Sequence, residues 1–136
     1  MQREEVVRVL GRNGITITPQ RVEVGEVLFS RAQHVSAEQI IDEIKQHGKS
    51  VSKATVYNTL NRFVAKGIAK AVHVNPERTF YDSVITYHHH FYNEDTHEIT
   101  DIDPASLVIQ QMPEIPPGTE LQDIEVVIHV RNKQDI

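Results

Sequence analysis

The feature that most constrains the fold of this chain is a change of hydrophobic period at Gly67. In the segment 52–66, apolar residues follow i, i+4, i+7, i+8 spacing at Val56, Leu60, Phe63 and Val64. After Gly67, residues 68–74 and 78–82 are typical of two strands joined by a turn. Short helices followed by a hairpin are the order of a winged helix-turn-helix, although a small helical core with any attached hairpin would give the same pattern.

Hydroxyl residues placed before the apolar segments predict where the helices begin. Thr18-Pro19 offers a capping oxygen followed by proline at the first helical position, and Ser36-Ala37-Glu38-Gln39 matches a capping box. Ser52 takes the same place before the next helix, and Lys66-Gly67 ends that helix with a left-handed glycine. A further short helix is expected over 4–10.

The remainder of the chain is expected to form a small sheet. Segments 87–93, 98–102 and 124–130 are typical of strands. Residues 103–120 are rich in proline and leave room for one short helix over about 104–111. Because three strands with exposed apolar residues are not stable alone, we expect a second copy of the chain to complete or cover the sheet.

Charge divides the chain into two parts with different expected partners. Residues 1–85 carry 12 Lys and Arg against 9 Asp and Glu, whereas residues 86–136 carry 2 against 10. Five of the eight histidines lie between His88 and His129. A mildly basic part joined to a strongly acidic part predicts two modules, of which the first suits nucleic acid.

Composition excludes several classes of protein and site. The chain has no cysteine, which rules out disulfides, thiolate zinc sites and cysteine nucleophiles. No apolar run approaches the roughly 20 residues that a membrane span needs, and the N-terminus lacks the pattern of a secretory signal. We therefore expect a cytoplasmic protein without a membrane partner, in which histidine and carboxylate hold any metal.

The predicted helix over 52–66 offers a polar face suited to the major groove of double-stranded DNA. A recognition helix needs short donors and acceptors for base edges and cations for phosphates. Arg21 at the preceding helix and Arg78 on the hairpin could add contacts to the DNA backbone or minor groove. A solvated helix face is the alternative. The candidate residues on the helix are Lys53, Thr55, Tyr57, Asn58 and Arg62.

The histidine run at His88-His89-His90 is a candidate metal site. Successive residues on a strand point to opposite faces, so His88 and His90 share a face and His89 does not. A divalent ion needs about four to six ligands, so other segments must contribute donors. A surface cluster with only opportunistic metal affinity is the alternative.

Four motifs, in this order, resemble those of the ferric uptake regulator (Fur) family over nearly the whole chain: Thr18-Pro19-Gln20-Arg21, His34-Val35-Ser36-Ala37-Glu38, Ala54-Thr55-Val56-Tyr57 and His88-His89-His90. The runs 88–92 and 126–131 are most similar to the iron response regulator (Irr) branch. The resemblance implies an α+β protein with a winged helix-turn-helix DNA-binding domain, here 1–84, and a small α/β dimerisation and sensing domain, here 85–136.

The same resemblance implies which residues bind ligands. It assigns an inter-domain site for Fe, Mn or Zn to His34, Asp82, His88, His90 and Asp101. In the Irr branch the histidine run is associated with haem, which makes His88, His89 and His90 haem candidates. Tyr57 matches the family's base-contacting tyrosine. The family's Cys-x-x-Cys zinc site is replaced here by Asn93-Glu94-Asp95-Thr96, whereas His97 and His129 have no assigned role and are expected at the surface.

The expected function is that of a homodimeric, sequence-specific transcription regulator, mainly a repressor, of iron and haem homeostasis genes. The dimer could assemble further on promoter DNA. One alternative is a manganese-, zinc- or peroxide-responsive regulator of the same family. Others are a small histidine and carboxylate metalloenzyme, which lacks an obvious nucleophile or general base near His88 and His90, and a protein-interaction module.

Overall fold

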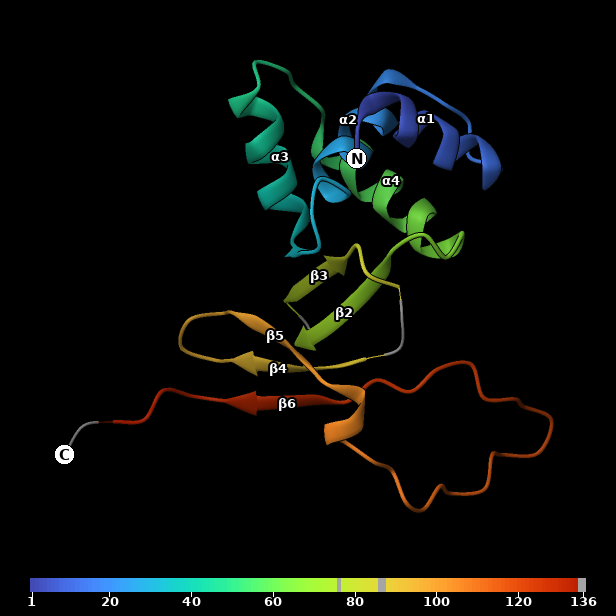
Figure 1. Ribbon diagram of the computed structural model, residues 1–136, viewed down its shortest axis with the longest axis vertical. Coiled ribbons are helices and arrows are strands. Elements are labelled where there is room, and N and C mark those ends of the chain that lie inside the picture. Colours follow the sequence, from blue (N-terminus) through green and yellow to red (C-terminus); the bar gives the residue numbers. More distant parts are fainter. Residues whose placement is uncertain (76, 86–87, 135–136) are drawn as a thin grey trace. The chain divides into compact units, whose positions relative to one another are not determined.

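The computed structural model describes residues 1–75, 77–85 and 88–134, and the chain divides into two units, Met1–Ile85 and Thr86–Ile136 (Figure 1). Pro76, in the turn of the predicted hairpin, and residues 86–87, where a strand is predicted to begin, lie outside the described residues. Among the described residues, no helix has the length and apolar character needed to cross a membrane.

The first unit combines four helices with a three-stranded sheet. In the sheet the strand order is β1-β3-β2, and β3 pairs antiparallel with both neighbours. This pairing matters for function because it sets His34 on β1 directly opposite Asp82 on β3. The elements are α1 (Arg3–Arg12), α2 (Pro19–Leu28), β1 (His34–Val35), α3 (Ala37–Gln46), α4 (Lys53–Ala65), β2 (Lys70–Asn75) and β3 (Arg78–Asp82).

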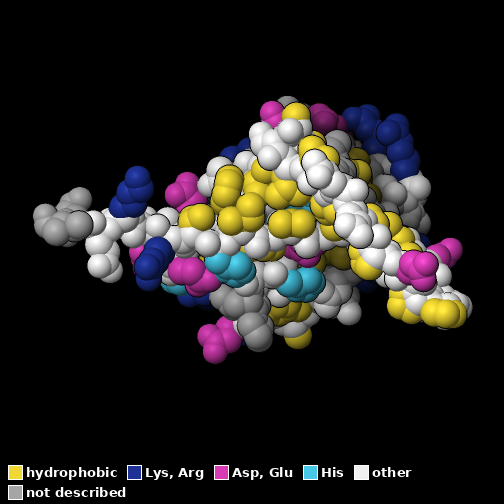
Figure 2. All heavy atoms as spheres, turned by 90° about the horizontal axis from the view of Figure 1, so that it is seen from below, with side chains coloured by type: hydrophobic (Ala, Val, Ile, Leu, Met, Phe, Trp, Pro, Cys, Tyr) yellow, Lys and Arg dark blue, Asp and Glu magenta, His cyan; other side chains and the backbone are white. Residues whose placement is uncertain are grey.

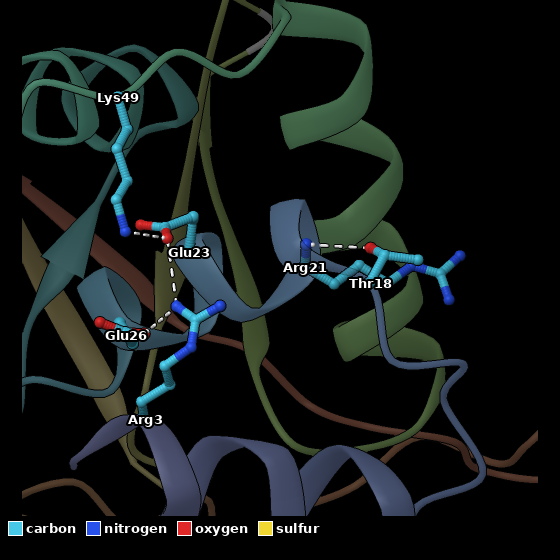
Figure 3. A network of polar contacts seen from close by, with 6 residues as sticks. All are labelled: Arg3, Thr18, Arg21, Glu23, Glu26 and Lys49. Carbon is cyan, nitrogen blue, oxygen red and sulfur yellow. Dashed lines mark hydrogen bonds and ion pairs between the residues drawn. The ribbon is translucent and has the colours of Figure 1, made fainter.

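The helix starts predicted from hydroxyl residues are confirmed. The Thr18 hydroxyl accepts a hydrogen bond from the Arg21 amide at 3.2 Å (Figure 3), and the Ser52 hydroxyl accepts one from the Thr55 amide at 3.2 Å. Ser36 forms the full capping box with Gln39. Each cap satisfies an amide that the helix itself leaves without a partner.

The predicted end of α4 is confirmed as well. Gly67 takes φ +75°, a left-handed conformation that favours glycine, and the Ile68 amide donates to the Phe63 carbonyl at 3.0 Å. The chain therefore turns sharply out of α4, and β2 begins at Lys70.

The core of the first unit joins the apolar sides of all four helices. Phe29, which follows α2, stacks on Phe63 of α4 with ring centroids 5.7 Å apart. Because the apolar side of α4 is used in this way, its opposite side is left to solvent and to any ligand. The fully buried side chains of the core are Val6, Leu10, Val24, Leu28, Ile40, Val56, Leu60 and Phe63.

A network of ion pairs fastens α1 and α2 to the loop before α4 (Figure 3). Arg3 donates to Glu26 at 2.8 Å and to Glu23 at 3.2 Å, and Lys49 donates to Glu23 at 2.7 Å. Burial raises the pKa of Glu23, but the hydrogen bonds from Lys49 and Arg3 outweigh it, and the net pKa lies below 4.5. Glu23 is therefore held as a carboxylate between two cations.

The second unit is a three-stranded sheet of order β5-β4-β6, with strands β4 (His89–Asn93), β5 (Ile99–Ile102) and β6 (Val127–Val130). Strand β4 runs antiparallel to β5 and parallel to β6. The register places His90 opposite Asp101 on β5 and opposite Val127 on β6. Charged and apolar residues of three separate segments are thus brought together on one small sheet.

The connection between β5 and β6 differs from the prediction. The helix expected over 104–111 is a single 3-10 turn, Pro104–Ser106, capped by an Asp103 carboxylate that accepts from the Ala105 amide at 3.0 Å. Leu107 returns to extended backbone. Because Val108 and Ile109 are exposed, no buried apolar side supports a longer helix. The last strand also begins at Val127, three residues later than expected.

Candidate metal centre and nucleic-acid interface

The outward side of α4 carries every helix residue predicted to contact DNA. Lys53, Asn58 and Arg62 are exposed, and Thr55 and Tyr57 are half-buried. The side chains that alternate with them point into the core of the unit. A helix fixed by its core on one side and lined with short polar groups and cations on the other has the composition that major-groove binding requires.

The two arginines predicted beside this helix lie in different settings. Arg21, in the first turn of α2, donates to the Thr16 carbonyl at 2.8 Å, and with Thr55 and Asn58 it lines an open hollow between α2 and α4. Arg78 begins β3 and is exposed. It lines a second hollow, on the side of α4 that carries Tyr57. Both cations therefore flank the polar side of α4.

Tyr57 is held by an acidic residue from another helix. Its hydroxyl donates a hydrogen bond to Glu38 Oε1 at 2.8 Å, and Lys53 Nζ lies 3.6 Å from the same oxygen. The hydrogen bond from Tyr57 is the main cause that lowers the pKa of Glu38, and donating it to the carboxylate raises the pKa of Tyr57. At neutral pH the pair is thus a carboxylate and a neutral phenol.

In the first unit, two of the predicted metal ligands face each other across β1 and β3. His34 Nε2 lies 3.0 Å from Asp82 Oδ2. The side chain of Asp82 is only 1% exposed, and its other oxygen accepts from the Val84 amide at 2.8 Å. The carboxylate is therefore fixed in orientation, with one oxygen bound to backbone and the other directed to the imidazole.

In the second unit, the other three predicted ligands converge. His88 Nε2 and His90 Nε2 each lie 3.4 Å from Asp101 Oδ1, and the two imidazole centroids are 4.5 Å apart. Strand pairing brings His90 and Asp101 together, and the two-residue spacing places His88 on the same side as His90. Both histidines are buried, whereas half of the Asp101 side chain is exposed.

His89 occupies the opposite side of β4 and belongs to the core of its sheet. It is 1% exposed, and its Nδ1 accepts a hydrogen bond from the Val126 amide at 3.0 Å. An Nδ1 that accepts leaves the proton of the neutral ring on Nε2. His89, one of the three haem candidates, is therefore already used as a structural side chain.

The donors of each unit fit a divalent cation. Ligands about 2.1 Å from a zinc-sized ion lie about 3.0 Å apart at right angles and about 3.4 Å apart at tetrahedral angles. The His34–Asp82 separation of 3.0 Å and the two separations of 3.4 Å in the second unit match these spacings. Neutral imidazole and carboxylate together suit Fe(II), Mn(II) and Zn(II). Each set is smaller than a full coordination shell and so fits as part of one.

A cluster of hydrogen bonds fastens the end of the chain to the turn after β4, and we call it the C-terminal clasp: Asn93, Glu94, Asp95, His129 and Asn132. Asn93 Nδ2 donates to Asn132 Oδ1 at 2.9 Å, the Asn132 amide donates to Asp95 Oδ2 at 2.9 Å, and His129 Nδ1 lies 2.6 Å from Glu94 Oε1. The Asn93 carboxamide oxygen also accepts from the amides of Asp95 and Thr96. His97 and His129 are exposed, and His97 Nδ1 contacts the Tyr92 hydroxyl at 2.9 Å.

Sequence reasoning missed Glu38 as a functional candidate. We read it only as a member of the capping motif that begins α3. The available signal was its position in the first helical turn, which leaves its side chain on the surface beside the start of the next helix. No local spacing relates it to Tyr57, because the two residues are 19 positions apart in sequence and lie on different helices.

Comparisons with known proteins agree with this architecture. The sequence model of the ferric uptake regulator family matches residues 12–129. A ferric uptake regulation protein of Pseudomonas putida is 30% identical over 128 residues, covering 92% of this chain and 96% of that protein. The structure of the ferric uptake regulator from Pseudomonas aeruginosa with manganese matches with a TM-score of 0.72 and 26% identity, covering 94% of this chain and 98% of that one.

A second solved structure gives the same result. The ferric uptake regulator from Francisella tularensis with iron matches with a TM-score of 0.74 and 25% identity, covering 88% of this chain and 93% of that chain. Because both likenesses extend over nearly the whole length of each chain, they confirm the predicted α+β fold class, with a winged helix-turn-helix followed by a small second domain.

Proposed function

The chain belongs to the ferric uptake regulator family, whose members are metal-responsive, DNA-binding transcription regulators and not enzymes, and from that premise we propose that it represses iron-homeostasis genes as a homodimer in the cytoplasm. Its affinity for promoter DNA would depend on a divalent cation. The observation that carries the proposal is the presence of five imidazole and carboxylate donors, grouped at ligand spacing in each unit.

For DNA binding, the proposal assigns base contacts to the outward side of α4. Thr55, Tyr57 and Asn58 carry hydroxyl and amide groups that suit contacts with base edges, whereas Lys53 and Arg62 carry charges that suit phosphates. Arg21 and Arg78 extend the positive surface to either side of the helix. The support for this assignment is that all of these side chains reach the surface, four of them fully exposed and Arg21, Thr55 and Tyr57 half-buried, while the opposite face of α4 is fixed in the core.

For sensing, the proposal joins the donors of both units around one ion. His34 and Asp82 would supply two ligands, and His88, His90 and Asp101 would supply the rest. A bound ion would impose a coordination geometry and so would restrict how the two units can be arranged. Since a ligand that binds one arrangement preferentially shifts the population toward it, metal would alter the spacing of the two α4 helices in a dimer.

Haem is a second candidate ligand within the iron-responsive branch, because imidazole is a common axial ligand of haem iron. The structure favours His88 or His90 over His89 in this role, since the Nδ1 of His89 accepts from the Val126 amide inside the sheet. Haem binding would compete with a divalent cation for the same side chains.

For dimerisation, the proposal uses the exposed apolar side of the second sheet. Phe91 on β4 and Ile128 on β6 are register partners and are 38% and 37% exposed, and Val130 is 38% exposed. Figure 2 shows hydrophobic side chains grouped on the face of the molecule that includes this unit. A second copy of the chain covering these residues would remove apolar surface from water.

The test begins with selection of duplex DNA from a random pool by the purified full-length protein, with Mn(II), Zn(II) or Fe(II) added singly. A regulator gives a defined operator, and removal of the metal with EDTA changes the affinity for it at least tenfold. The metal with the largest effect separates iron, manganese and zinc responses, and added peroxide or haem tests the remaining alternatives. Equal affinity for all duplexes, with and without metal, would overturn the proposal.

A further inference from the structure

An acidic side chain lies on the surface proposed to read DNA. Glu38 is on α3, its side chain is 56% exposed, and it contacts Tyr57 and Lys53 of α4. DNA carries a dense array of phosphate charges, so a carboxylate on such a surface weakens binding unless it serves another purpose. The contact with Tyr57 indicates what that purpose is.

The hydrogen bond determines what the Tyr57 hydroxyl can do. The hydroxyl has one hydrogen, and that hydrogen is given to Glu38 Oε1 at 2.8 Å. Only the lone pairs of the oxygen remain for another partner. Lys53 Nζ lies 3.6 Å from the same carboxylate oxygen and 5.9 Å from the centroid of the Tyr57 ring, so the three side chains form one cluster.

Packed elements hold this cluster in place. Glu38 lies within the capping box of α3, between Ser36 and Gln39. Tyr57 lies one turn into α4, and its neighbours Val56 and Leu60 on that helix are fully buried. Both residues line the hollow that β3 closes with Arg78 and Thr79. The direction of the Tyr57 ring is therefore set by three elements rather than by a free loop.

We propose that Glu38 is a specificity-determining positioning residue for DNA recognition by this chain. It fixes the Tyr57 ring and makes the hydroxyl an acceptor toward DNA, which selects the amino groups of adenine or cytosine in the major groove. Its charge also weakens binding to DNA that offers no such partner. The inference rests on the proposed DNA-binding function and adds a residue to it.

Two substitutions separate the two roles of Glu38. Glu38→Gln removes the charge but keeps an oxygen that can accept from Tyr57, whereas Glu38→Ala removes both. Affinity is measured by fluorescence anisotropy for the selected operator and for a scrambled duplex of equal length. Both variants should bind the scrambled duplex about threefold more tightly. The ratio of the two affinities should fall about tenfold or more in Glu38→Ala and about threefold in Glu38→Gln, where only the charge is lost.

Three controls exclude a general effect on folding or charge. Glu43→Gln makes the same change of charge on the same helix and should leave the affinity ratio unchanged. In a Tyr57→Phe background, which lacks the hydroxyl, Glu38→Ala should lower the affinity ratio only by the roughly threefold that the loss of charge causes. A spectrophotometric titration should show one phenol ionising at lower pH in Glu38→Ala than in the unchanged protein, since Glu38 raises the pKa of Tyr57.

The outcomes distinguish this inference from the function on which it rests. A chain that binds all duplexes equally overturns both. If the chain selects an operator and Glu38→Ala keeps the same selectivity, the inference alone is overturned. It is also overturned if Glu38→Ala costs as much selectivity in the Tyr57→Phe background as it does in the unchanged protein. If the phenol titration is unchanged in Glu38→Ala, Tyr57 does not donate to Glu38 in solution, and the inference loses the contact on which it is built.

Discussion

His89 lies within a run of three histidines, yet its surroundings are those of a core residue. It is buried on the side of β4 opposite His88 and His90, and its Nδ1 satisfies the Val126 amide. Loss of that acceptor leaves a backbone donor without its partner and opens a space in the sheet. A position in a ligand-rich motif is thus occupied for structural reasons.

We therefore predict that His89→Ala destabilises the protein by about 2–4 kcal/mol, measured by urea unfolding with divalent metal removed. His129→Ala, in the same sheet, should cost less than about 1 kcal/mol because its contact with Glu94 is solvent-exposed. If His89→Ala keeps full stability but no longer responds to metal or haem, His89 is a ligand and the core assignment is wrong.

The sequence could predict part of the candidate site at this scale. Alternation along a strand was sufficient to separate His89 from His88 and His90, and the structure agrees. The pairing of Asp101 with His90 and of Asp82 with His34 depends on strand register, which no local pattern contains, so those residues entered only through a resemblance. Glu38 was missed because its contact joins two separate helices.

Among the elements, the approach of α1 to α2 depends on a glycine. A Cβ added at Gly25 would lie 2.6 Å from Cγ1 of Val6, which is fully buried and has no room to move. Only a residue without a Cβ allows the two helices to pack at this distance. A Cβ added at Gly11, on the outer side of α1, meets no such obstacle, because its nearest neighbour would be Cδ1 of Ile17 at 4.0 Å.

We expect Gly25→Ala to lower the free energy of unfolding by about 1–3 kcal/mol through overpacking, and Gly11→Ala to raise it by about 0.5–1 kcal/mol through helix propensity. Val6→Ala should relieve the overpacking, so the double variant with Gly25→Ala should be more stable than the sum of the single effects predicts. Additive effects in thermal or urea unfolding would contradict the close approach of these helices.

The ion pairs that connect α1, α2 and the loop before α4 make part of the stability depend on pH. The pKa of Glu23 is below its unfolded value of 4.5, so its stabilising effect is present above pH 4.5 and is lost as pH falls through the folded pKa. Glu23→Gln should therefore cost about 1 kcal/mol at pH 7 and almost nothing in acid. Urea unfolding at both pH values, with the exposed Asp42→Asn as the control, measures this difference, and a cost that is equal at both would contradict it.

The helices of the first unit could be predicted because their signals are local. Capping hydroxyls, apolar spacing and the left-handed Gly67 all act within a few residues, and each was confirmed. The segment 103–126 could not be predicted in the same way. Most of its apolar residues are exposed and none is buried, so they support no α-helix. The parallel pairing of β6 with β4 is set by the sheet rather than by the segment that precedes it.

For the molecule as a whole, the proposed sensor requires donors from both units. His34→Ala removes a donor of the first unit, and the combined His88→Ala and His90→Ala removes two of the second. We predict that either change reduces the effect of metal on operator affinity tenfold or more, because a shared ion loses its ability to hold both units. Sedimentation should show unchanged dimerisation, since none of these side chains belongs to the exposed apolar side of the sheet.

Operator binding measured with and without the metal identified by selection gives the result, with the exposed His73→Ala as a matched control. If only the second set of changes abolishes the response, the ion is held by one unit alone and the coupling must take another route. If neither does, the sensor is elsewhere in the chain.

The C-terminal clasp consists of carboxamides, carboxylates, an imidazole and backbone groups, with Asn93 at its centre. The clasp contains no sulfur that an oxidant could modify, and its hydrogen bonds form without a bound metal ion. We therefore expect the tail to stay anchored in the presence of oxidants and of metal chelators. The proposed sensor could then lose its ion while the second unit keeps its fold.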